Sequence, residues 1–317
     1  MMKIAIVGAG AMGCLFGLAL REAGAEVVLC DVWQEHVDAI NKNGLHMVRQ
    51  GFSEYIKIPA VTDVRTIGEP DVVIIFTKSI HTEAAVKQAL EIMGPKTPVA
   101  TFQNGLGNIA VIERYVGAGR VIAGITNWPS ELFEPGAIRV EGTGFIKLGF
   151  AAGAEAADET VEVGSELCRL LNDMNCEMSD DIMKEVWEKL AFNNAMNLIT
   201  SLTKQRDGDM SGSPYGFELC TLVAREVCDV AAAEGVGADY DAVLRTIERV
   251  ADPTGPINHI TSMLQDVLKM KQTEVDAICG AVIQKASIHG INTPHLKTLF
   301  NMIKVVEENY ETQVLSL

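Results

Sequence analysis

Two hydrophobic periodicities alternate along the first half of the chain. Short runs rich in β-branched residues predict strands, and the stretches between them, in which apolar residues recur every three to four positions, predict helices. The predicted strands cover residues 3–7, 26–30, 72–76, 98–101 and 121–126, and the predicted helices cover 11–23, 34–43, 82–92 and 108–115. Alternation of this kind is typical of βαβ units, so we expect a parallel sheet covered by helices.

The pattern changes twice after residue 120. Four glycines, at positions 136, 142, 144 and 149, punctuate two strand-like runs at 138–141 and 145–148, which we predict to be antiparallel. Beyond about residue 157 the strand signal fades, apart from a short run at 176–178. Helical periodicity then covers 161–172, 181–198, 217–234, 239–250, 260–270, 274–289 and 295–309. The sequence therefore predicts an α/β fold, with a parallel sheet and an antiparallel extension in residues 1–172 and an all-α domain in residues 173–317.

Composition excludes several classes of protein. The chain has 317 residues, of which 48% are hydrophobic, and this is enough to bury a core in each of two domains. A net charge of −16 opposes binding to nucleic acid or to an anionic membrane, although a local basic site can still hold a small anion. No apolar run reaches the ~18 residues of a membrane span, and a strand-like run begins at Lys3 in place of a signal peptide. We expect a soluble, cytoplasmic protein.

Neither the cysteines nor the histidines suggest a metal site. The seven cysteines are scattered through apolar stretches without a Cys-x-x-Cys pair, so we expect small, reduced core residues. The six histidines are equally dispersed, and none forms an i, i+4 pair. We predict that the protein binds no metal.

A glycine-rich loop lies between the first predicted strand and the first predicted helix. It consists of Gly8, Ala9, Gly10, Ala11, Met12 and Gly13. In this context the first glycine permits a tight turn, the second lets a pyrophosphate approach the backbone, and the third lets the helix pack on the strand. The pyrophosphate would lie on the unpaired N–H groups of the helix start. The loop predicts a dinucleotide cofactor, and the alternative is an ordinary strand-to-helix turn.

Asp31 ends the second predicted strand and indicates which dinucleotide is bound. A carboxylate here accepts hydrogen bonds from the ribose hydroxyls of NAD and repels the 2′-phosphate of NADP. The nearest lysine or arginine downstream is Lys42, on the following predicted helix. The sequence therefore favours NAD(H), unless Asp31 is a plain surface residue. A nicotinamide cofactor implies hydride transfer, and hydride transfer to a ketone requires a proton donor.

The predicted helix at 181–198 carries a polar stripe that can supply this donor. Helical spacing places Lys189, Asn193 and Asn197 at i, i+4 and i+8 on one face. With Asn194, the helix has three asparagines in its interior, where each costs on the order of 0.5 kcal/mol. One interpretation is a solvated surface stripe. The functional interpretation makes Lys189 a general acid with a lowered pKa and assigns the three asparagines to substrate oxygens.

Four segments, in order along the chain, resemble a known family. They are Gly8-Ala-Gly-Ala-Met-Gly13, Phe102-Gln-Asn-Gly-Leu-Gly107, Glu185-Val-Trp-Glu-Lys-Leu-Ala-Phe-Asn-Asn-Ala-Met-Asn197, and Thr261-Ser-Met-Leu-Gln-Asp266 followed by Thr273-Glu-Val-Asp276. With them the sequence resembles the ketopantoate reductases (2-dehydropantoate 2-reductases), part of the wider 6-phosphogluconate-dehydrogenase-like group. The resemblance implies a dinucleotide-binding Rossmann domain at 1–172, a helical substrate and catalytic domain at 173–317, and a place in pantothenate and coenzyme A biosynthesis.

The resemblance implies two catalytic residues. Lys189 matches the family's catalytic lysine, which protonates the forming alkoxide, and Glu274 matches a glutamate that orients the substrate and supports the lysine. From the residues alone, Thr273 and Glu274 fit equally well at the start of a helix. In that interpretation the threonine is the cap and the glutamate interacts with the helix dipole.

Three further matches concern the substrate. Ser262 matches the serine that binds the substrate carboxylate, although Ser262 and Gln265 also fit a capping box. Asn193 and Asn197 match substrate-binding asparagines. The implied partner is a small 2-keto acid.

Two matches concern the cofactor. Asn104 matches an asparagine near the nicotinamide and the lysine, and its alternative is a simple Asn-Gly turn residue. Lys78, at the carboxyl end of the strand at 72–76, matches a lysine close to the cofactor. Many members of the family carry an arginine after the second strand that receives the 2′-phosphate of NADP, their usual cofactor, whereas this chain has Asp31-Val-Trp.

Three hypotheses follow. The leading one is NAD(P)H-dependent reduction of ketopantoate to (R)-pantoate with Lys189 as general acid. A variant is NADH-dependent reduction of another bulky 2-keto acid to an (R)-2-hydroxy acid. One branch of the family has this activity, and the stretches at 30–36 and 125–129 resemble that branch. The rival is a non-catalytic NAD-binding sensor. The apolar helices of the second half also allow a homodimer.

Overall fold

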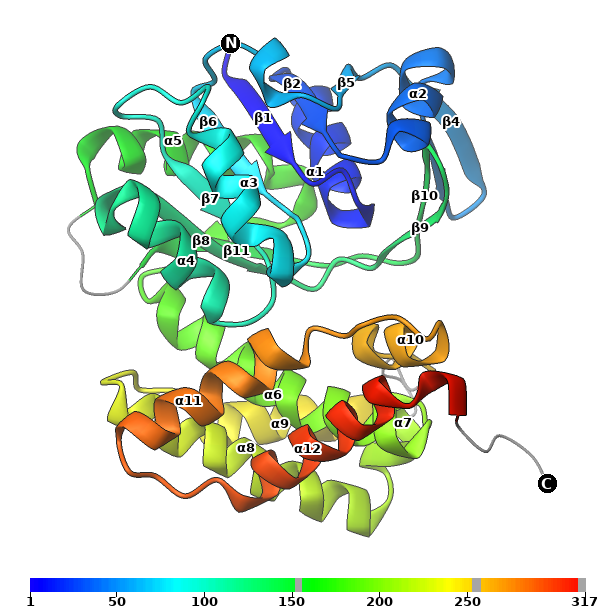
Figure 1. The fold of residues 1–317 in the computed structure, drawn as a ribbon, viewed down its shortest axis with the longest axis vertical. Coiled ribbons are helices and arrows are strands. Elements are labelled where there is room, and N and C mark those ends of the chain that lie inside the picture. The colour runs from blue at the N-terminus through cyan, green and yellow to red at the C-terminus, as the bar shows by residue number, and fades with distance from the viewer. Residues whose placement is uncertain (152–155, 253–257, 313–317) are drawn as a thin grey trace. The chain divides into compact units, whose positions relative to one another are not determined.

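The chain divides into two compact units, shown together in Figure 1. The structure is a computed structural model that describes residues 1–151, 156–252 and 258–312. The first unit contains Met1–Gln103 and Asn108–Met183, and the second contains Asn104–Gly107 and the chain from Lys184 onward. The predicted domain limits, with a boundary between residues 172 and 173, stay a prediction.

An eight-stranded sheet forms the centre of the first unit, in the order β12-β11-β8-β7-β6-β1-β2-β5. Its strands are β1 (Lys3–Val7), β2 (Glu26–Cys30), β5 (Ala60–Val61), β6 (Val72–Ile75), β7 (Val99–Thr101), β8 (Val121–Thr126), β11 (Ile146–Phe150) and β12 (Cys176–Met178). From β5 to β8 all pairings are parallel, whereas β11 runs antiparallel to β8 and parallel to β12. The predicted parallel sheet with an antiparallel extension is confirmed.

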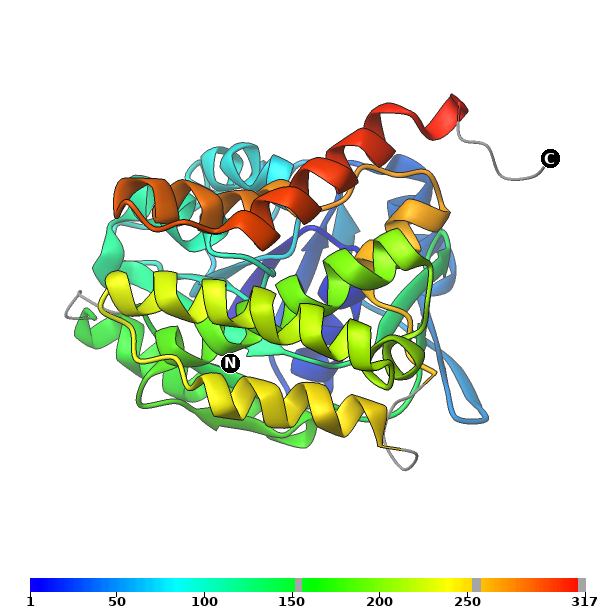
Figure 2. The same cartoon turned by 90° about the horizontal axis from the view of Figure 1, so that it is seen from below.

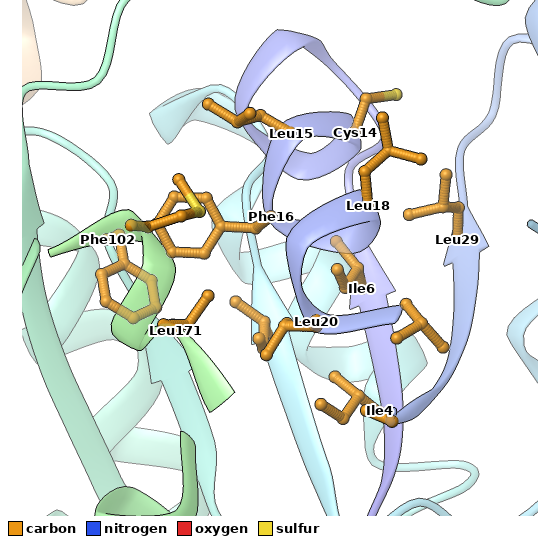
Figure 3. Close-up of a cluster of buried hydrophobic side chains, with 14 of the residues drawn as sticks. Ile4, Ile6, Cys14, Leu15, Phe16, Leu18, Leu20, Leu29, Phe102 and Leu171 are labelled. Carbon is orange, nitrogen blue, oxygen red and sulfur yellow. The ribbon is translucent and has the colours of Figure 1, made fainter. Parts of the chain in front are cut away.

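Helices of the first unit bury their apolar faces on this sheet. They are α1 (Ala11–Glu22), α2 (Gln34–Asn43), α3 (Thr82–Ala89), α4 (Gly107–Val116) and α5 (Asp158–Leu170). Figure 3 shows Phe16 pointing from α1 toward Phe102, with Leu18 facing Leu29 on the other side of the helix. The ring of Phe16 lies 4.8 Å from the rings of both Phe76 and Phe102. Burial of each such side chain contributes about 1.5–3 kcal/mol, so this cluster fixes α1 and the loop that precedes it.

A second, four-stranded sheet, in the order β4-β3-β10-β9, was not predicted. Its strands are β3 (Leu45–Arg49), β4 (Phe52–Ile56), β9 (Ser130–Glu134) and β10 (Ala137–Val140). The two antiparallel runs predicted around residues 138 and 145 are therefore strands of different sheets, β10 and β11, each antiparallel to another partner. Gly142 has φ +93°, and a Cβ at Gly144 would lie 2.7 Å from the Trp128 backbone, so the chain changes sheet through a turn that glycine permits.

The second unit is helical, as predicted. Its helices are α6 (Ile182–Thr203, which begins at the end of the first unit), α7 (Asp207–Ser211), α8 (Pro214–Ala233), α9 (Tyr240–Ala251), α10 (Ser262–Leu268), a π-helix at Asp276–Gly280, α11 (Ala281–Ile288) and α12 (Pro294–Glu308). Figure 2 shows α8 lying between α9 and α12. The single helix predicted at 274–289 is interrupted, because its first part is wound as a π-helix. π-helical turns are rare and frequently occur at functional sites.

Short 3₁₀ turns connect several of these elements. They are η1 (Val64–Thr66), η2 (Ser79–His81), η3 (Ala118–Arg120), η4 (Asn172–Met174) and η6 (Tyr310–Thr312). Within the described residues, no helix is both long and apolar enough to cross a membrane.

Candidate functional site

Glycine is required for different reasons at two positions of the loop between β1 and α1, and at the third the chain itself does not require it. Gly8 has φ +100°, and a Cβ there would lie 2.6 Å from the Phe76 carbonyl carbon. A Cβ at Gly13 would lie 2.0 Å from the Gly8 oxygen, so only glycine allows the helix to approach the strand this closely. At Gly10, in contrast, a Cβ would meet no atom within 4 Å. The chain itself thus requires Gly8 and Gly13, while Gly10 leaves open space beside the backbone.

The open side of Gly10 fits a phosphate group. Gly10 is the N-cap residue of α1, no side chain caps the helix, and its first turn contains no acidic residue. The first N–H groups of a helix have no partners within the helix and carry partial positive charge. The start of α1 therefore has the features that bind a pyrophosphate. Ala9, Ala11 and Met12 contribute the backbone between the glycines.

Asp31 lies against this loop, as the sequence suggests for a ribose-binding carboxylate. It follows the last residue of β2, and its Oδ2 accepts a hydrogen bond of 2.8 Å from the Ala9 N–H. Its Oδ1 accepts one of 3.0 Å from the Trp33 N–H. Each carboxylate oxygen can accept a second hydrogen bond, so a ribose hydroxyl can still be bound at this half-buried side chain.

Lys78 lies exposed immediately before η2, and a residue that the sequence did not single out supports its neighbours. The Gln103 amide donates to the Thr77 carbonyl and to Thr82 Oγ1, and it accepts from Thr101 Oγ1. Gln103 thereby fixes the backbone next to Lys78 from the end of the neighbouring strand β7. Only the resemblance in the segment starting at Phe102 could have drawn attention to it.

Lys189 and Glu274 interact within the second unit. Lys189 lies near the start of α6 with its side chain half-buried, and burial lowers its pKa to about 8, while the negative charge of Glu274 acts in the opposite direction. Removing an ammonium group from water disfavours its charged form, whereas a nearby carboxylate favours it. The lysine is consequently placed to exchange a proton near neutral pH.

Asn193 and Asn197 extend this face of α6. Asn197 is 5% exposed and Asn193 is half-buried. Among the described residues, neither side chain forms a hydrogen bond with another part of the chain. Their amide atoms are not among the fully buried polar atoms that lack a partner, so the amides stay open to solvent and to a ligand. Two such amides in line with an ionisable lysine therefore indicate a surface for a polar ligand.

Asn194 differs from its two neighbours. It is fully buried, and its Nδ2 donates to the Leu190 carbonyl at 2.9 Å and to the Ile278 carbonyl at 3.2 Å. The sequence groups it with the asparagines that hold substrate oxygens, but the structure gives it an internal role. It ties α6 to the π-helix that follows Glu274.

Ser262 is not the cap of α10. Thr261 is the N-cap, and its Oγ1 accepts from the Leu264 N–H at 3.3 Å. The same hydroxyl lies 2.9 Å from Thr200 Oγ1 of α6. The capping-box alternative for Ser262 is wrong, because the helix begins one residue earlier than that alternative requires. Ser262 is instead the exposed first residue of the helix.

The segment around Glu274 is held on both sides. Before it, Glu307 Oε1 accepts from the Thr273 N–H and from Thr273 Oγ1, each at 2.7 Å. Thr273 Oγ1 in turn accepts from the Val275 N–H at 3.2 Å, so the cap role of this turn belongs to Thr273. After it, Asn194 binds the Ile278 carbonyl. Glu274 is thus presented from a backbone fixed by α6 and α12.

Asn104 belongs to the same compact unit as Lys189 and Glu274. Its neighbour Gly105 has φ +90°, and a Cβ there would lie 2.5 Å from the Ala277 carbonyl oxygen. Glycine at 105 therefore lets the loop 104–107 pack on the π-helix. The structure brings Asn104, which the sequence places far from Glu274, to the turn that follows it.

In the described part of the chain, no group of three or more histidine, cysteine, aspartate or glutamate residues lies close enough together to hold a metal ion.

The chain is similar to known proteins over nearly all of its length. The family model described as "Ketopantoate reductase PanE/ApbA" matches residues 4–153, and the model of its C-terminal part matches residues 181–307. The 2-dehydropantoate 2-reductase of Pyrococcus horikoshii is 31% identical over 96% of this chain and 98% of its own length. That of Streptococcus pyogenes is 29% identical over the same shares. Among solved structures, D-mandelate dehydrogenase with NADH and anilino(oxo)acetate has a TM-score of 0.90 and 30% identity, covering 98% of this chain and all of that chain.

Proposed function

The chain belongs to the ketopantoate reductase (PanE/ApbA) family, and from this membership we propose that it reduces ketopantoate to (R)-pantoate with a reduced nicotinamide cofactor. Members of the family are NAD(P)-dependent oxidoreductases, and so is this chain. The observation that carries the proposal is the stripe on α6, in which a lysine of lowered pKa precedes two amides that form no hydrogen bond within the described residues.

The loop at 8–13 and Asp31 hold the cofactor in this proposal. The N–H groups at the start of α1, beside Gly10, would hold the pyrophosphate, and Asp31 would accept hydrogen bonds from the adenosine ribose hydroxyls. Lys78 and Asn104 bind nearer the nicotinamide. The bound nicotinamide supplies a hydride to the carbonyl carbon of the substrate.

Lys189 supplies the proton. As negative charge develops on the carbonyl oxygen, the Nζ ammonium donates its proton and becomes a neutral amine. A pKa of about 8 suits this step, because the group is charged at neutral pH and still gives up its proton readily. Glu274 keeps the lysine protonated before the reaction. A non-catalytic sensor has no use for such an acid.

Asn193, Asn197 and Ser262 hold the substrate. The amide groups donate to the keto oxygen and to the carboxylate, and the Ser262 hydroxyl, which no helix cap requires, donates to the carboxylate. The hydroxyl of Thr261, the residue before Ser262, bonds to Thr200 of α6, so the start of α10 with Ser262 is held against the helix that carries the two asparagines.

A second candidate substrate is an aromatic or branched 2-keto acid such as phenylglyoxylate. Two observations favour it. The structure of D-mandelate dehydrogenase with NADH matches this chain over its whole length, and Asp31 is suited to NADH rather than NADPH. The reaction at the lysine is the same for both substrates.

Steady-state assays test the two candidates directly. Loss of NADH and of NADPH absorbance is followed with ketopantoate, phenylglyoxylate and 4-methyl-2-oxopentanoate. The proposal expects the highest kcat/KM with ketopantoate. A higher kcat/KM with phenylglyoxylate would assign the chain to the second candidate, and turnover of neither would contradict both.

Replacing Asp31 by asparagine should change the cofactor preference. Asp31→Asn keeps one side-chain oxygen to accept from the Ala9 or Trp33 N–H but removes the charge that repels a 2′-phosphate. We expect the ratio of kcat/KM for NADPH to that for NADH to rise on the order of tenfold. Asp38→Asn, on the exposed side of α2, is the matched control and should leave the ratio unchanged. If the two variants have the same ratio of kcat/KM for NADPH to that for NADH, Asp31 does not determine the cofactor preference.

A further inference from the structure

His36 is the one fully buried histidine of the six, all of which lie in described residues. It stands in the first turn of α2, and both of its ring nitrogens have partners. The Gly136 N–H donates to Nδ1 at 2.8 Å, so Nδ1 carries no proton. Nε2 lies 2.8 Å from the Ala9 carbonyl oxygen, and in the neutral ring it holds the proton and donates it to that oxygen.

The electrostatic surroundings agree with a neutral ring. Burial lowers the pKa of His36, while the hydrogen bond to Ala9 and the charge of Asp31 act weakly against this shift. Cys14 is the other ionisable neighbour, with Sγ 3.6 Å from Nε2 and 3.0 Å from the Ala9 oxygen, and burial keeps its thiol protonated. The ring of Trp33 stacks on the imidazole at 5.4 Å.

The bond to Ala9 acts on the cofactor loop through peptide geometry. The peptide unit is planar and trans, so the Ala9 carbonyl and the Gly10 N–H point in opposite directions. His36 holds the carbonyl from the buried side, and the Gly10 N–H is therefore directed away from it. Asp31 holds the other end of Ala9 through its N–H. Both peptide units of Ala9 are thus fixed by side chains that follow β2.

We propose that His36 is a positioning residue for the cofactor: its Nε2–H fixes the Ala9 carbonyl and thereby aims the Gly10 N–H at the pyrophosphate of the dinucleotide. This inference rests on the proposed cofactor site at Gly10. The second nitrogen extends the arrangement to the second sheet, because Gly136 lies in the turn between β9 and β10. Ser130 of β9 adds a contact to the same loop by donating to the Ala11 carbonyl at 3.1 Å.

Two substitutions separate this role from a purely structural one. The amide nitrogen of glutamine reaches the position of Nε2, and the amide oxygen of asparagine reaches the position of Nδ1. His36→Gln therefore keeps a donor to Ala9 and loses the acceptor for Gly136, whereas His36→Asn does the reverse. Each variant loses one buried hydrogen bond, so a structural role predicts similar effects on cofactor binding.

The measurement is the Kd for NADH and for ADP-ribose, with adenosine as a ligand that lacks the pyrophosphate. We expect His36→Asn to raise the Kd for NADH and ADP-ribose about tenfold and His36→Gln to raise it less than about threefold. Binding of adenosine should be unchanged in both. In turnover, KM for the cofactor should rise in His36→Asn while kcat at saturating cofactor stays the same. Equal Kd values for NADH in the two variants would overturn the proposal.

A measurement on the unchanged protein covers the case in which His36→Asn does not fold. In protein labelled with ¹⁵N-histidine, the slowly exchanging Nε2–H resonance of the buried ring should shift when ADP-ribose is added and stay in place with adenosine. A resonance that does not shift when ADP-ribose is added would also overturn the proposal. Asp31→Ala distinguishes a wrong role for His36 from a wrong cofactor site. If the cofactor does not bind at this loop, Asp31→Ala leaves NADH binding unchanged, and if only the role of His36 is wrong, Asp31→Ala still weakens it.

Discussion

Lys189→Ala is expected to lower kcat for reduction by about 10²–10⁴-fold, the usual contribution of a general acid. Alanine cannot give a proton to the forming alkoxide, and water that takes its place is a far weaker acid than an ammonium group whose pKa is about 8. Cofactor binding should survive, because the loop at 8–13 and Asp31 belong to the other compact unit.

The comparison requires a lysine on the same helix. Lys184→Ala removes an exposed ammonium group of α6 that pairs with Glu188 at 3.8 Å, and kcat should stay within about twofold of the unchanged protein. Single-turnover reduction and NADH binding are measured for both variants. Normal turnover of Lys189→Ala would remove the lysine from the mechanism.

The pH profile of kcat/KM reports the same group. Lysine is protonated below its pKa, so reduction should be independent of pH below about 8 and fall as the pH rises above it. Glu274 raises the pKa of Lys189, so Glu274→Gln should move the fall in kcat/KM to lower pH. If the fall in kcat/KM stays at the same pH or moves to higher pH, the pairing of Glu274 with Lys189 is contradicted.

Gly10→Val is expected to raise the Kd for NADH about 100-fold and to lower the free energy of unfolding by only about 1 kcal/mol, because valine is a weaker N-cap than glycine. The backbone of Gly10 has φ −66° and ψ −168°, which any residue can adopt, and a Cβ there would meet no atom of the chain. The added side chain would instead occupy the space through which the pyrophosphate reaches the N–H groups of α1.

The matched control is Gly237→Val. Gly237 also has open space around its Cβ position and no positive φ, but it belongs to the second compact unit, whereas the loop belongs to the first. Both variants should fold, with a small fall in Tm for Gly10→Val at the N-cap of α1, and only Gly10→Val should lose NADH affinity in a fluorescence titration. Gly8 and Gly13 cannot serve in this test, since a side chain at either would collide with backbone atoms. Normal binding of NADH by Gly10→Val would place the pyrophosphate elsewhere.

The sequence predicted those elements that depend on neighbouring residues. The strands at 3–7 and 26–30, the helix at 34–43 and the loop between β1 and α1 appear where the periodicity and the glycines indicate, because a period and a turn are properties of a few consecutive residues. The stripe of Lys189, Asn193 and Asn197 is another local property, since helical spacing alone aligns these positions.

Long-range contacts escaped the sequence. Strands β3 and β4 carry few buried side chains, so their polar and apolar residues do not alternate in the way that predicts a strand. They form a sheet only by pairing with each other and with β9 and β10. Thr261 and Ser262 are equally good caps by residue type, and the hydroxyl of Thr200 on α6 lies next to only one of them.

The sequence by itself determined the order of elements, the glycine-rich loop at 8–13 and the alignment of the polar stripe, because these depend on residue types at short spacings. Only the tertiary structure decided which polar side chains form hydrogen bonds within the chain. Asn194 and Asn197 are chemically identical, but the Ile278 carbonyl, 84 positions away from Asn194, lies beside that asparagine. His36 gains its role from Gly136, 100 positions away. Hydrogen bonds over such separations depend on how whole elements pack, which no local pattern encodes.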